Sequence, residues 1–216
     1  MTIAVGFQCT DCVVLCADRE MSKGNSLKFP EGKIFSATLA GSLEAVLTLT
    51  YSGDSYAAKS IFDDLVKTIH LELPNRKEVF PMDRFAGFIS DHIPRADRRY
   101  VELLIGFSLK GTSPCLYVVR DGKVLKGARE CIGLGETSLT RYISELTYAM
   151  FDKEQSVRLG LYLVSLASRY VSGCGSGMDA GVVTSEAYEP IDTSKYFQFF
   201  IDIDKAVKGA IIGNLS

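Results

Sequence analysis

The residues best suited to chemistry lie in the first 33 positions of the chain. Thr2 directly follows the initiator methionine, and removal of that methionine would leave a hydroxyl and a free α-amine on one residue. An α-amine has a pKa of roughly 7.7–8.0, so it can accept the hydroxyl proton near neutral pH without a histidine. A threonine activated by its own amine is an established type of covalent nucleophile. Asp18 ends the second apolar run and Lys33 begins the next, so these 33 residues are a candidate catalytic apparatus.

The composition of the 216 residues is that of an ordinary soluble globular protein and favours a single domain, residues 1–216. The formal net charge of −2 gives no support for binding to nucleic acid or to an anionic membrane. No apolar run reaches the roughly 18 residues of a membrane span, and the N-terminus lacks the pattern of a secretory signal. We therefore expect a cytoplasmic protein without nucleic-acid or membrane partners, whose six cysteines are reduced.

Cys9 and Cys12 have the spacing of a redox or metal-binding pair. A redox pair of this spacing is expected where a strand turns into a helix, whereas this pair brackets a turn between two predicted strands. A zinc site would need a second ligand pair, and the remaining candidates are isolated in the sequence: Cys115, Cys131, Cys174, His70 and His92. Structural cysteines, and no metal or cofactor, are therefore the favoured interpretation, with redox or metal use as the alternative.

Short β-type runs must position the candidate residues. The strands predicted in the first third are residues 3–7, 13–17, 33–35 and 37–40. The first two enclose a polar turn and predict a hairpin. Gly41 and Ser42 interrupt the strand pattern, and Ser42 is a candidate helix N-cap. Helical spacing of apolar residues predicts a helix over residues 55–70, and a second helix is expected around residues 82–93.

The rest of the chain repeats this succession of strands and helices. Further strands are predicted at residues 100–108, 115–120, 123–126, 131–133, 182–184 and 197–203. Asp121-Gly122 is a strong signal for a hairpin turn. Two apolar stripes, from Leu139 to Met150 and from Leu159 to Tyr170, predict helices. Because strands and helices come in blocks, the order predicts an α+β fold, a four-layer αββα sandwich of two antiparallel sheets with helices outside each.

With Thr2, Asp18, Lys33 and the Ala40-Gly41 pair in place, the chain resembles the proteasome β-subunit family of N-terminal-nucleophile hydrolases. The matching segments are Thr2-Ile3-Ala4-Val5, Val13-Val14-Leu15-Cys16-Ala17-Asp18, Lys33-Ile34 and Thr38-Leu39-Ala40-Gly41. Sixteen residues separate Thr2 from Asp18, as in the family, and Lys33 fits after a one-residue deletion. The resemblance implies the four-layer αββα fold, in a divergent homologue of bacterial or archaeal type.

The resemblance implies a role for each matching position. Thr2 looks like the nucleophile and its amine like the general base. Lys33 looks like the cation that favours the ionised Thr2 hydroxyl, and Asp18 like the carboxylate that keeps Lys33 charged and oriented. The Gly41 backbone N–H looks like the oxyanion-hole donor, where a glycine lets the substrate backbone approach closely. Each residue taken singly has an ordinary structural role as its alternative, so the hypothesis depends on their joint spacing.

Several positions depart from the family pattern. Leu134, between two glycines, stands where the family usually has a serine that supports the nucleophile, and Glu20 stands where active relatives often carry arginine. Ser176 and Asp179 occupy approximately the positions of a family aspartate and serine, with the residue types exchanged. They are expected either to form a hydrogen-bonded pair near Thr2 or merely to shape a turn.

The resemblance implies a threonine-type endopeptidase that cleaves peptides or unfolded proteins within a homo-oligomeric ring, with an ATPase as a candidate partner. By position, the side-chain pocket would be mainly apolar and formed by Met21, Ser22, Glu31, Phe35, Leu39 and Leu43. Glu31 could instead favour a basic side chain, and core packing is an equal alternative for all six. Leu134 and the altered segment 173–181 favour the rival, a non-catalytic ring subunit, and a small-molecule amidase of the same chemistry is the third alternative.

Overall fold

The computed structural model describes residues 2–23, 27–40, 44–72, 84–93, 101–133, 152–175 and 177–213, with the backbone alone over 21–23, 27–30 and 211–213. Within these residues the strands form two five-stranded antiparallel sheets and a separate two-stranded hairpin. The hairpin, β3 (Glu20–Lys23) and β4 (Leu27–Pro30), is not predicted by the sequence.

The first sheet carries the start of the chain. Its strand order is β10-β1-β2-β11-β12, with bounds β10 Arg129–Ile132, β1 Ala4–Gln8, β2 Val13–Asp18, β11 Met178–Val183 and β12 Tyr188–Pro190. The hairpin predicted at residues 3–17 is confirmed as β1 and β2, and the Cys9 N–H donates to the Cys12 carbonyl at 2.8 Å. All six residues of β2 are buried, since both faces of this sheet are covered.

The second sheet has the order β5-β6-β7-β8-β9, with bounds β5 Ile34–Leu39, β6 Ala45–Gly53, β7 Val101–Leu109, β8 Cys115–Arg120 and β9 Lys123–Lys126. The predicted turn between β8 and β9 is confirmed, because Asp121 and Gly122 have φ angles of 50° and 74°, as a type I′ hairpin requires. The expected helix start at Ser42 lies outside the described residues, but the segment after it is strand β6. Leu47 and Leu49 belong to the core cluster under α1 and α2, whereas Val46 belongs to the cluster between the two sheets. Side chains that alternate between two faces are typical of a strand and do not form one face of a helix.

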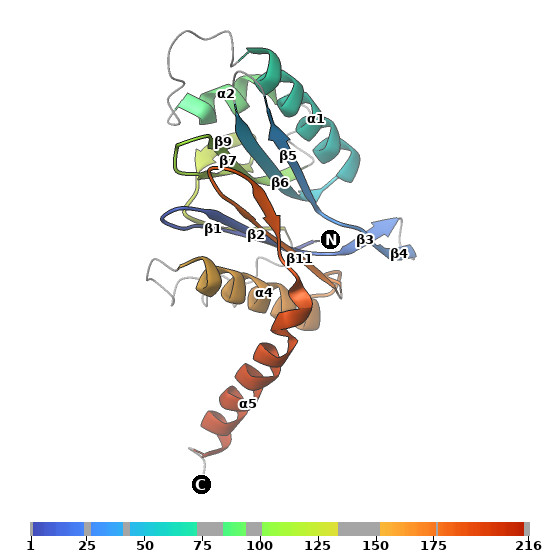
Figure 1. Ribbon diagram of the computed structural model, residues 1–216. Helices are drawn as coiled ribbons and strands as arrows, with labels where there is room; N and C mark the ends of the chain where they lie inside the picture. Colours follow the sequence, from blue (N-terminus) through green and yellow to red (C-terminus); the bar gives the residue numbers. More distant parts are fainter. Residues whose placement is uncertain are drawn as a thin grey trace.

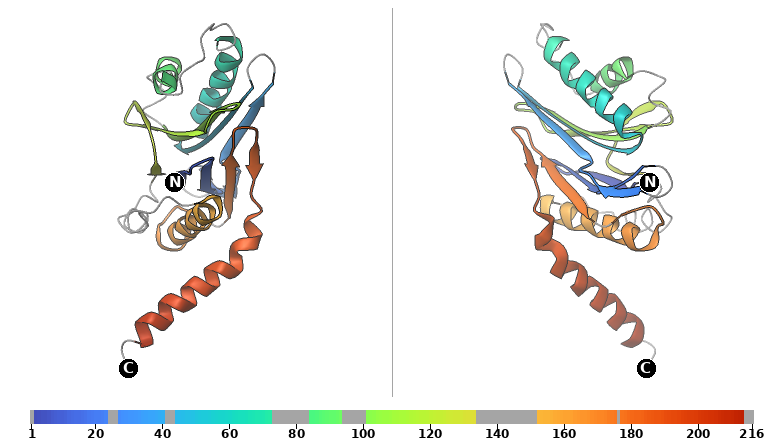
Figure 2. Two further views of the ribbon diagram at one scale, coloured as in Figure 1. Left: turned by 60° about the vertical axis from the view of Figure 1, so that its left-hand side comes forward. Right: turned by 90° about the vertical axis from the view of Figure 1, so that its right-hand side faces the viewer.

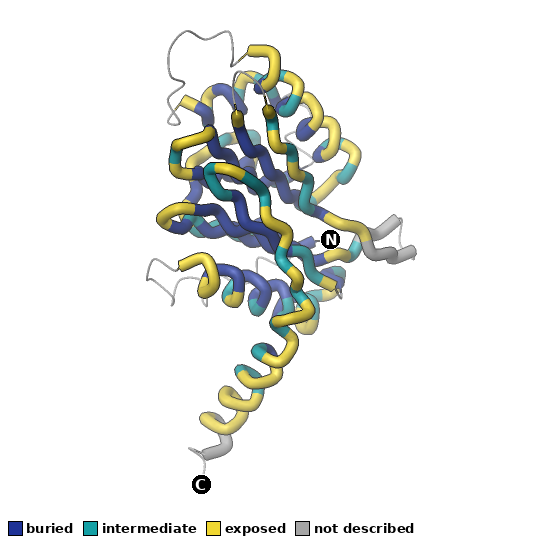
Figure 3. The backbone as a smooth tube through the Cα atoms, viewed as in Figure 1, coloured by how far each residue is buried: buried dark blue, intermediate teal, exposed yellow. Residues whose placement is uncertain are grey.

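Helices cover the outer faces of the two sheets (Figures 1 and 2). α1 (Ser55–Glu72) and α2 (Phe85–His92) lie over the second sheet, and α4 (Lys153–Tyr170) lies over the first. Between the sheets, Val13 and Leu15 of one pack with Leu104 and Leu116 of the other. The predicted αββα order is thus confirmed, and the inner strands are the most deeply buried part of the molecule (Figure 3).

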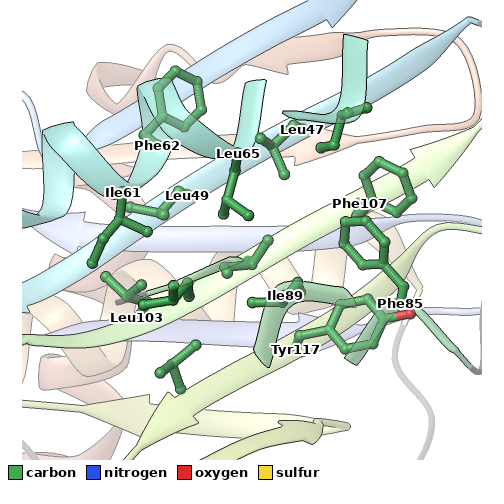
Figure 4. Close-up of a cluster of buried hydrophobic side chains, with 14 of the residues drawn as sticks. Leu47, Leu49, Ile61, Phe62, Leu65, Phe85, Ile89, Leu103, Phe107 and Tyr117 are labelled. Atoms are coloured by element: carbon green, nitrogen blue, oxygen red, sulfur yellow. The ribbon is translucent and has the colours of Figure 1, made fainter. Parts of the chain in front are cut away.

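The outer core of the second sheet is built largely from aromatic and branched side chains (Figure 4). Phe85 of α2 stacks on Phe107 of β7 with ring centroids 3.6 Å apart and also contacts Tyr117 of β8. Ile61 and Leu65 of α1 belong to the same cluster. This packing holds the second sheet rigid, so its inner face can serve as a fixed platform for the first sheet.

The strand predicted at residues 197–203 is wrong, because this segment is the start of helix α5 (Phe197–Gly213). Phe197, Phe200 and Ile201 fall at i, i+3 and i+4, which is the spacing of one helical face. A 3₁₀ turn, Thr193–Tyr196, leads into the helix, and the Asp192 side chain accepts a hydrogen bond from the Ser194 N–H at its start. α5 projects away from the sheets and is exposed over most of its length (Figures 1 and 3).

The helical stripe from Leu139 to Met150 lies outside the described residues. Among the helices that the structure describes, none combines the length and apolar character needed to cross a membrane.

Candidate active site

Three buried polar side chains meet at the N-terminal end of β1. The Lys33 Nζ donates hydrogen bonds to the Thr2 Oγ1 at 2.7 Å and to the Asp18 Oδ1 at 2.9 Å. Thr2 is 4% exposed, and Asp18 and Lys33 are 0% exposed. The structure therefore brings together a hydroxyl, an ammonium and a carboxylate out of contact with bulk water.

The β1–β2 hairpin sets the distance between Thr2 and Asp18. Ala4 pairs with Ala17, so Ile3 lies opposite Asp18. The Ile3 N–H donates to the Asp18 Oδ1 at 3.0 Å, and the Asp18 N–H donates to the Ile3 carbonyl at 3.1 Å. Thr2 is held at the same end of the hairpin as the carboxylate, and Lys33, just before β5, reaches both from the second sheet.

Both oxygens of the Asp18 carboxylate are hydrogen-bonded. In addition to the Lys33 ammonium and the Ile3 N–H on Oδ1, the backbone N–H groups of Gly175 and Glu20 donate to Oδ2 at 3.1 and 3.3 Å. A buried carboxylate is costly unless it is paired and hydrogen-bonded. These donors make Asp18 a stable anchor for the lysine.

Burial lowers the pKa of Lys33 from its ordinary value, and the nearby Asp18 carboxylate opposes that effect. The first cause is the loss of water around the ammonium, which disfavours its charged form. The Lys33 proton is consequently held less tightly than that of a lysine in water. An amine of this kind, in hydrogen-bond contact with a hydroxyl, can stabilise negative charge on that oxygen and exchange a proton with it.

Asp179 reaches the site through the backbone of Lys33. Its Oδ2 accepts a hydrogen bond from the Lys33 N–H at 3.3 Å, and its Oδ1 lies 3.5 Å from the Arg19 Nε. Burial raises the pKa of Asp179, and the Arg19 charge opposes that rise. Ser176, predicted as its partner, lies outside the described residues, as does Gly41, the predicted oxyanion-hole donor.

The two glycine-containing segments that the resemblance relates to the site lie against it at Gly133 and Gly175. Gly133 has a φ of +87°, and a Cβ there would lie 2.2 Å from the Thr2 carbonyl oxygen. A Cβ on Gly175 would lie 1.9 Å from the Glu20 Cβ. Cys174 is buried, and burial raises its pKa to about 11, with the Asp18 charge as the second cause. A cluster of glycines in the sequence indicates that another segment packs closely against the backbone there, but it does not indicate which segment.

Of the six residues proposed for a substrate pocket, the structure describes the side chains of Glu31, Phe35 and Leu39. Phe35 stacks on Tyr51 with ring centroids 5.5 Å apart, and Leu39 packs in the same cluster under α1. Glu31 is exposed, and its N–H donates to the Arg19 carbonyl at 2.8 Å. Met21 and Ser22 lie in β3, where the backbone alone is described, and Leu43 lies outside the described residues.

Cys9 and Cys12 face each other across the β1–β2 turn. A hydrogen bond from the Cys12 thiol lowers the pKa of Cys9 to about 7, while burial opposes the shift. The Cys9 Sγ also lies 3.2 Å from the Ser156 Oγ in the first turn of α4. In the part of the chain that the structure describes, no group of three or more His, Cys, Asp or Glu side chains is arranged to hold a metal ion.

Solved structures with the same fold cover nearly the whole chain. A Gly-1 mutant of Anbu from Hyphomicrobium sp. strain MC1 is 17% identical with a TM-score of 0.78, over 98% of this chain and 96% of that one. Anbu, described as an ancestral β-subunit, from Yersinia bercovieri is 15% identical with a TM-score of 0.73, over 99% and 96%. A helical assembly of the Anbu complex from Pseudomonas aeruginosa is 16% identical with a TM-score of 0.75, over 99% and 95%. At these identities the likeness shows the fold.

The sequence comparison is more specific to family. No curated protein sequence matches this chain. The family described as "Proteasome subunit" matches residues 2–183. These residues include the second sheet, the first sheet except β12, the helices α1, α2 and α4, and every residue of the buried Thr2–Asp18–Lys33 cluster. The resemblance inferred from the spacing of Thr2, Asp18 and Lys33 is confirmed: this chain belongs to the proteasome subunit family.

Proposed function

We propose that this chain is a threonine-type endopeptidase, with the Thr2 hydroxyl as its nucleophile after removal of Met1. The observation that carries the proposal is the 2.7 Å contact between the Thr2 Oγ1 and the Lys33 Nζ, with Asp18 behind the lysine at 2.9 Å. A purely structural threonine at the start of a strand does not need a buried ammonium against its hydroxyl, because burial of that charge is costly. The family match over residues 2–183 supports the same assignment.

The reaction follows from the positions of these groups. The Thr2 oxygen attacks the carbonyl carbon of a peptide bond while its proton passes to the free Thr2 amine, and the Lys33 ammonium stabilises the charge on the attacking oxygen. The amine then gives the proton to the leaving nitrogen as the peptide bond breaks, which leaves an ester on Thr2. Water, deprotonated by the same amine, attacks the ester and releases the acid. Asp18 keeps Lys33 charged and oriented throughout.

Further residues of the site belong to the proposal by their place in the sequence. Gly41 follows β5 closely and would donate its N–H to the oxyanion. Asp179 would position Lys33 through its backbone, with Ser176 beside it. The β3 residues Met21 and Ser22 lie three and four positions after Asp18, so they remain candidates for contact with the substrate side chain.

The proposed enzyme is one domain, residues 1–216, that works in a homo-oligomer. The Pseudomonas aeruginosa relative in the same fold forms a helical assembly. The exposed apolar residues of α5, Phe197 at 57% and Ile201 at 48%, suit burial against a second copy. A ring, rather than a helix, and an ATPase partner that delivers unfolded protein complete the proposal for the assembly.

A non-catalytic subunit of such an assembly is the second candidate. Leu134, in place of a hydrogen-bonding serine, favours it. Glu20, in place of the arginine of active relatives, favours it as well: its side chain lies against Gly175, and its charge acts on the Lys33 pKa. A small-molecule amidase would share the chemistry of Thr2 and differ in substrate, so a peptide library with mass-spectrometric readout separates it from the endopeptidase.

Intact mass spectrometry tests the proposal. The purified chain is incubated with a peptide epoxyketone, which reacts with an N-terminal threonine through both its hydroxyl and its amine, and cleavage of a fluorogenic peptide is followed in parallel. We expect loss of Met1, one adduct on Thr2, and peptide cleavage that Thr2→Ala abolishes and Thr2→Ser largely keeps. A chain that retains Met1 and forms no adduct would instead be the non-catalytic subunit.

A further inference from the structure

We propose that Glu102 and Arg120 are positioning residues for Thr2, acting through the backbone of Gly133. This inference rests on the proposed function, because it assigns these two residues a part in the reaction of Thr2. Neither side chain contacts Thr2 itself. They act by fixing the segment that lies against the Thr2 backbone.

The first step is the contact between Gly133 and Thr2. β10 pairs with β1 so that Ile132 lies opposite Ala4, and the chain then passes Thr2 at Gly133. A Cβ at Gly133 would lie 2.2 Å from the Thr2 carbonyl oxygen and 2.7 Å from the Ser52 Oγ, so the two backbones are in direct contact. Any displacement of Gly133 therefore changes the space available to the nucleophilic residue.

The second step is the attachment of Gly133 to Glu102. The Gly133 N–H donates to the Glu102 Oε2 at 2.8 Å. Gly133 is at a φ of +87°, a conformation with little steric restraint on glycine, so its orientation depends on such external contacts. A hydrogen bond to an ionised acceptor is roughly twice as strong as a neutral one. Glu102 is thus the group that fixes the direction of this peptide.

The third step is the support of Glu102 by Arg120. Leu103 pairs with Val119, so Glu102 and Arg120 face each other across β7 and β8. The Arg120 Nε donates to the Glu102 Oε1 at 3.0 Å, and its guanidinium also donates to the Cys131 carbonyl oxygen. Two side chains of the second sheet therefore hold the peptides on either side of Ile132, at the edge of the first sheet, beside Thr2.

The Glu102–Arg120 ion pair is partly buried, so it is stronger than an ordinary surface ion pair. The Arg120 and Glu102 side chains are 27% and 32% exposed, whereas Lys110, just after β7, and Glu44, just before β6, are 61% and 51% exposed. Exposed ion pairs contribute little to stability and constrain little. Lys110 and Glu44 bond to each other, while Glu102 and Arg120 each bond to the main chain near the site as well. Glu44→Ala is therefore a matched control.

The experiment measures the reactivity of Thr2 in the intact chain. Second-order rates of epoxyketone adduct formation, with kcat and KM for a peptide, are compared for the wild type, Glu102→Ala, Glu102→Gln and Glu44→Ala. Misplacement of a reacting group by about 1 Å costs about 100-fold in rate. We expect Glu102→Ala to lose 10- to 100-fold in adduct rate and kcat with KM little changed. Glu102→Gln, which keeps one acceptor oxygen for the Gly133 N–H, should recover part of that loss, and Glu44→Ala should behave like the wild type.

Hydrogen exchange supplies a readout that is independent of activity. Amides of residues 131–133 should exchange faster in Glu102→Ala, while those of 45–53 stay protected. If Glu102→Ala fails to fold, Glu102→Gln and Arg120→Lys carry the same comparison. If the wild type forms the Thr2 adduct and Glu102→Ala forms it equally fast, the positioning role alone is overturned. A wild type that forms no Thr2 adduct would overturn the proposed function, and the positioning role with it.

Discussion

Replacement of either member of the buried Lys33–Asp18 pair is expected to cost stability unequally. Asp18→Asn leaves the Lys33 ammonium, which is 0% exposed, without its carboxylate. Lys33→Met leaves the Asp18 carboxylate with three backbone donors still in place, from Ile3, Glu20 and Gly175. The asymmetry arises because the anion has partners in the main chain and the cation has the carboxylate and the Thr2 hydroxyl.

The magnitudes follow from the groups left behind. In Asp18→Asn, removal of one partner of the buried ion pair costs about 3–5 kcal/mol. The asparagine NH2 group would also face the Gly175 and Glu20 N–H groups, and these donors, left without an acceptor, add about 1–3 kcal/mol. Lys33→Met removes a hydrogen bond between charged groups, worth about 1.5–3 kcal/mol, and replaces the stem with one of similar shape. We expect Asp18→Asn to lose at least about 1 kcal/mol more than Lys33→Met, out of a total stability of about 5–15 kcal/mol.

The sign of the pH dependence follows from the lowered pKa of Lys33. Between that lowered pKa and the value of about 10.4 in the unfolded chain, the unfolded state binds more protons, so stability rises with pH. The loss of Asp18 lowers the Lys33 pKa further and widens this window. The deficit of Asp18→Asn relative to Lys33→Met should therefore shrink as the pH rises toward 10.

Urea unfolding at pH 7.5 and 9.5, read by circular dichroism, measures these differences, with epoxyketone labelling as the assay of function. Both variants should be unreactive, and Lys33→Met should show this in a well-folded chain. Equal costs for the two variants, or a greater cost for Lys33→Met, would refute the reasoning about the main-chain donors. An Asp18→Asn variant with normal Thr2 labelling would refute the role given to the pair.

Three further outcomes are expected elsewhere in the fold. Gly160→Ala should lower the melting temperature, because the added Cβ would lie 2.6 Å from the Cys16 Sγ. Overpacking costs about 1–3 kcal/mol, which exceeds the roughly 1 kcal/mol that alanine gains in helix propensity. A higher melting temperature would contradict this. Asp152→Ala removes the capping box of α4 and should cost about 1 kcal/mol in urea unfolding, whereas an unchanged midpoint would count against the cap. Alkylation of Cys9 in the native protein should have its pH midpoint near 7 and that of Cys174 near 11, and peptide mapping that finds the reverse order would contradict the assigned environments.

The core of the site could be predicted from the sequence because most of it is local. Thr2 and Asp18 lie in one hairpin, so their separation along the chain fixes their separation in space. Lys33 begins the next apolar run, and the resemblance to the proteasome β-subunit family, in addition to this position, is what joins it to them. The four-layer order could be predicted as well, since blocks of strands and helices allow few arrangements.

The remaining parts depend on contacts between distant segments. The resemblance relates the segments around residues 133 and 175 to the site, but the contacts of Gly133 with Thr2 and of Gly175 with Asp18 depend on how β10 and β11 pair in the first sheet, which no local pattern encodes. The strand expected at residues 197–203 is a helix because aromatic and branched residues favour strands only when neighbours cover them, and Phe197 is 57% exposed. No strand is predicted over β6 from the sequence, because Ser42 is a candidate helix start just before it, although Leu47 and Leu49 alternate there with Thr48 and Thr50.

The hydrogen bonds to Asp18 also bear on when the site can exist. Its partners, Ile3, Glu20, Lys33 and Gly175, are spread from the first residues of the chain to the last quarter. A nascent chain on the ribosome lacks the Gly175 segment and the β11 strand beside Asp18 until more than 157 residues after Asp18 have been synthesised. The hydrogen bonds that hold Asp18, and through it Lys33 and the proposed nucleophile Thr2, would thus be complete only after the Gly175 segment and β11 have folded against β2.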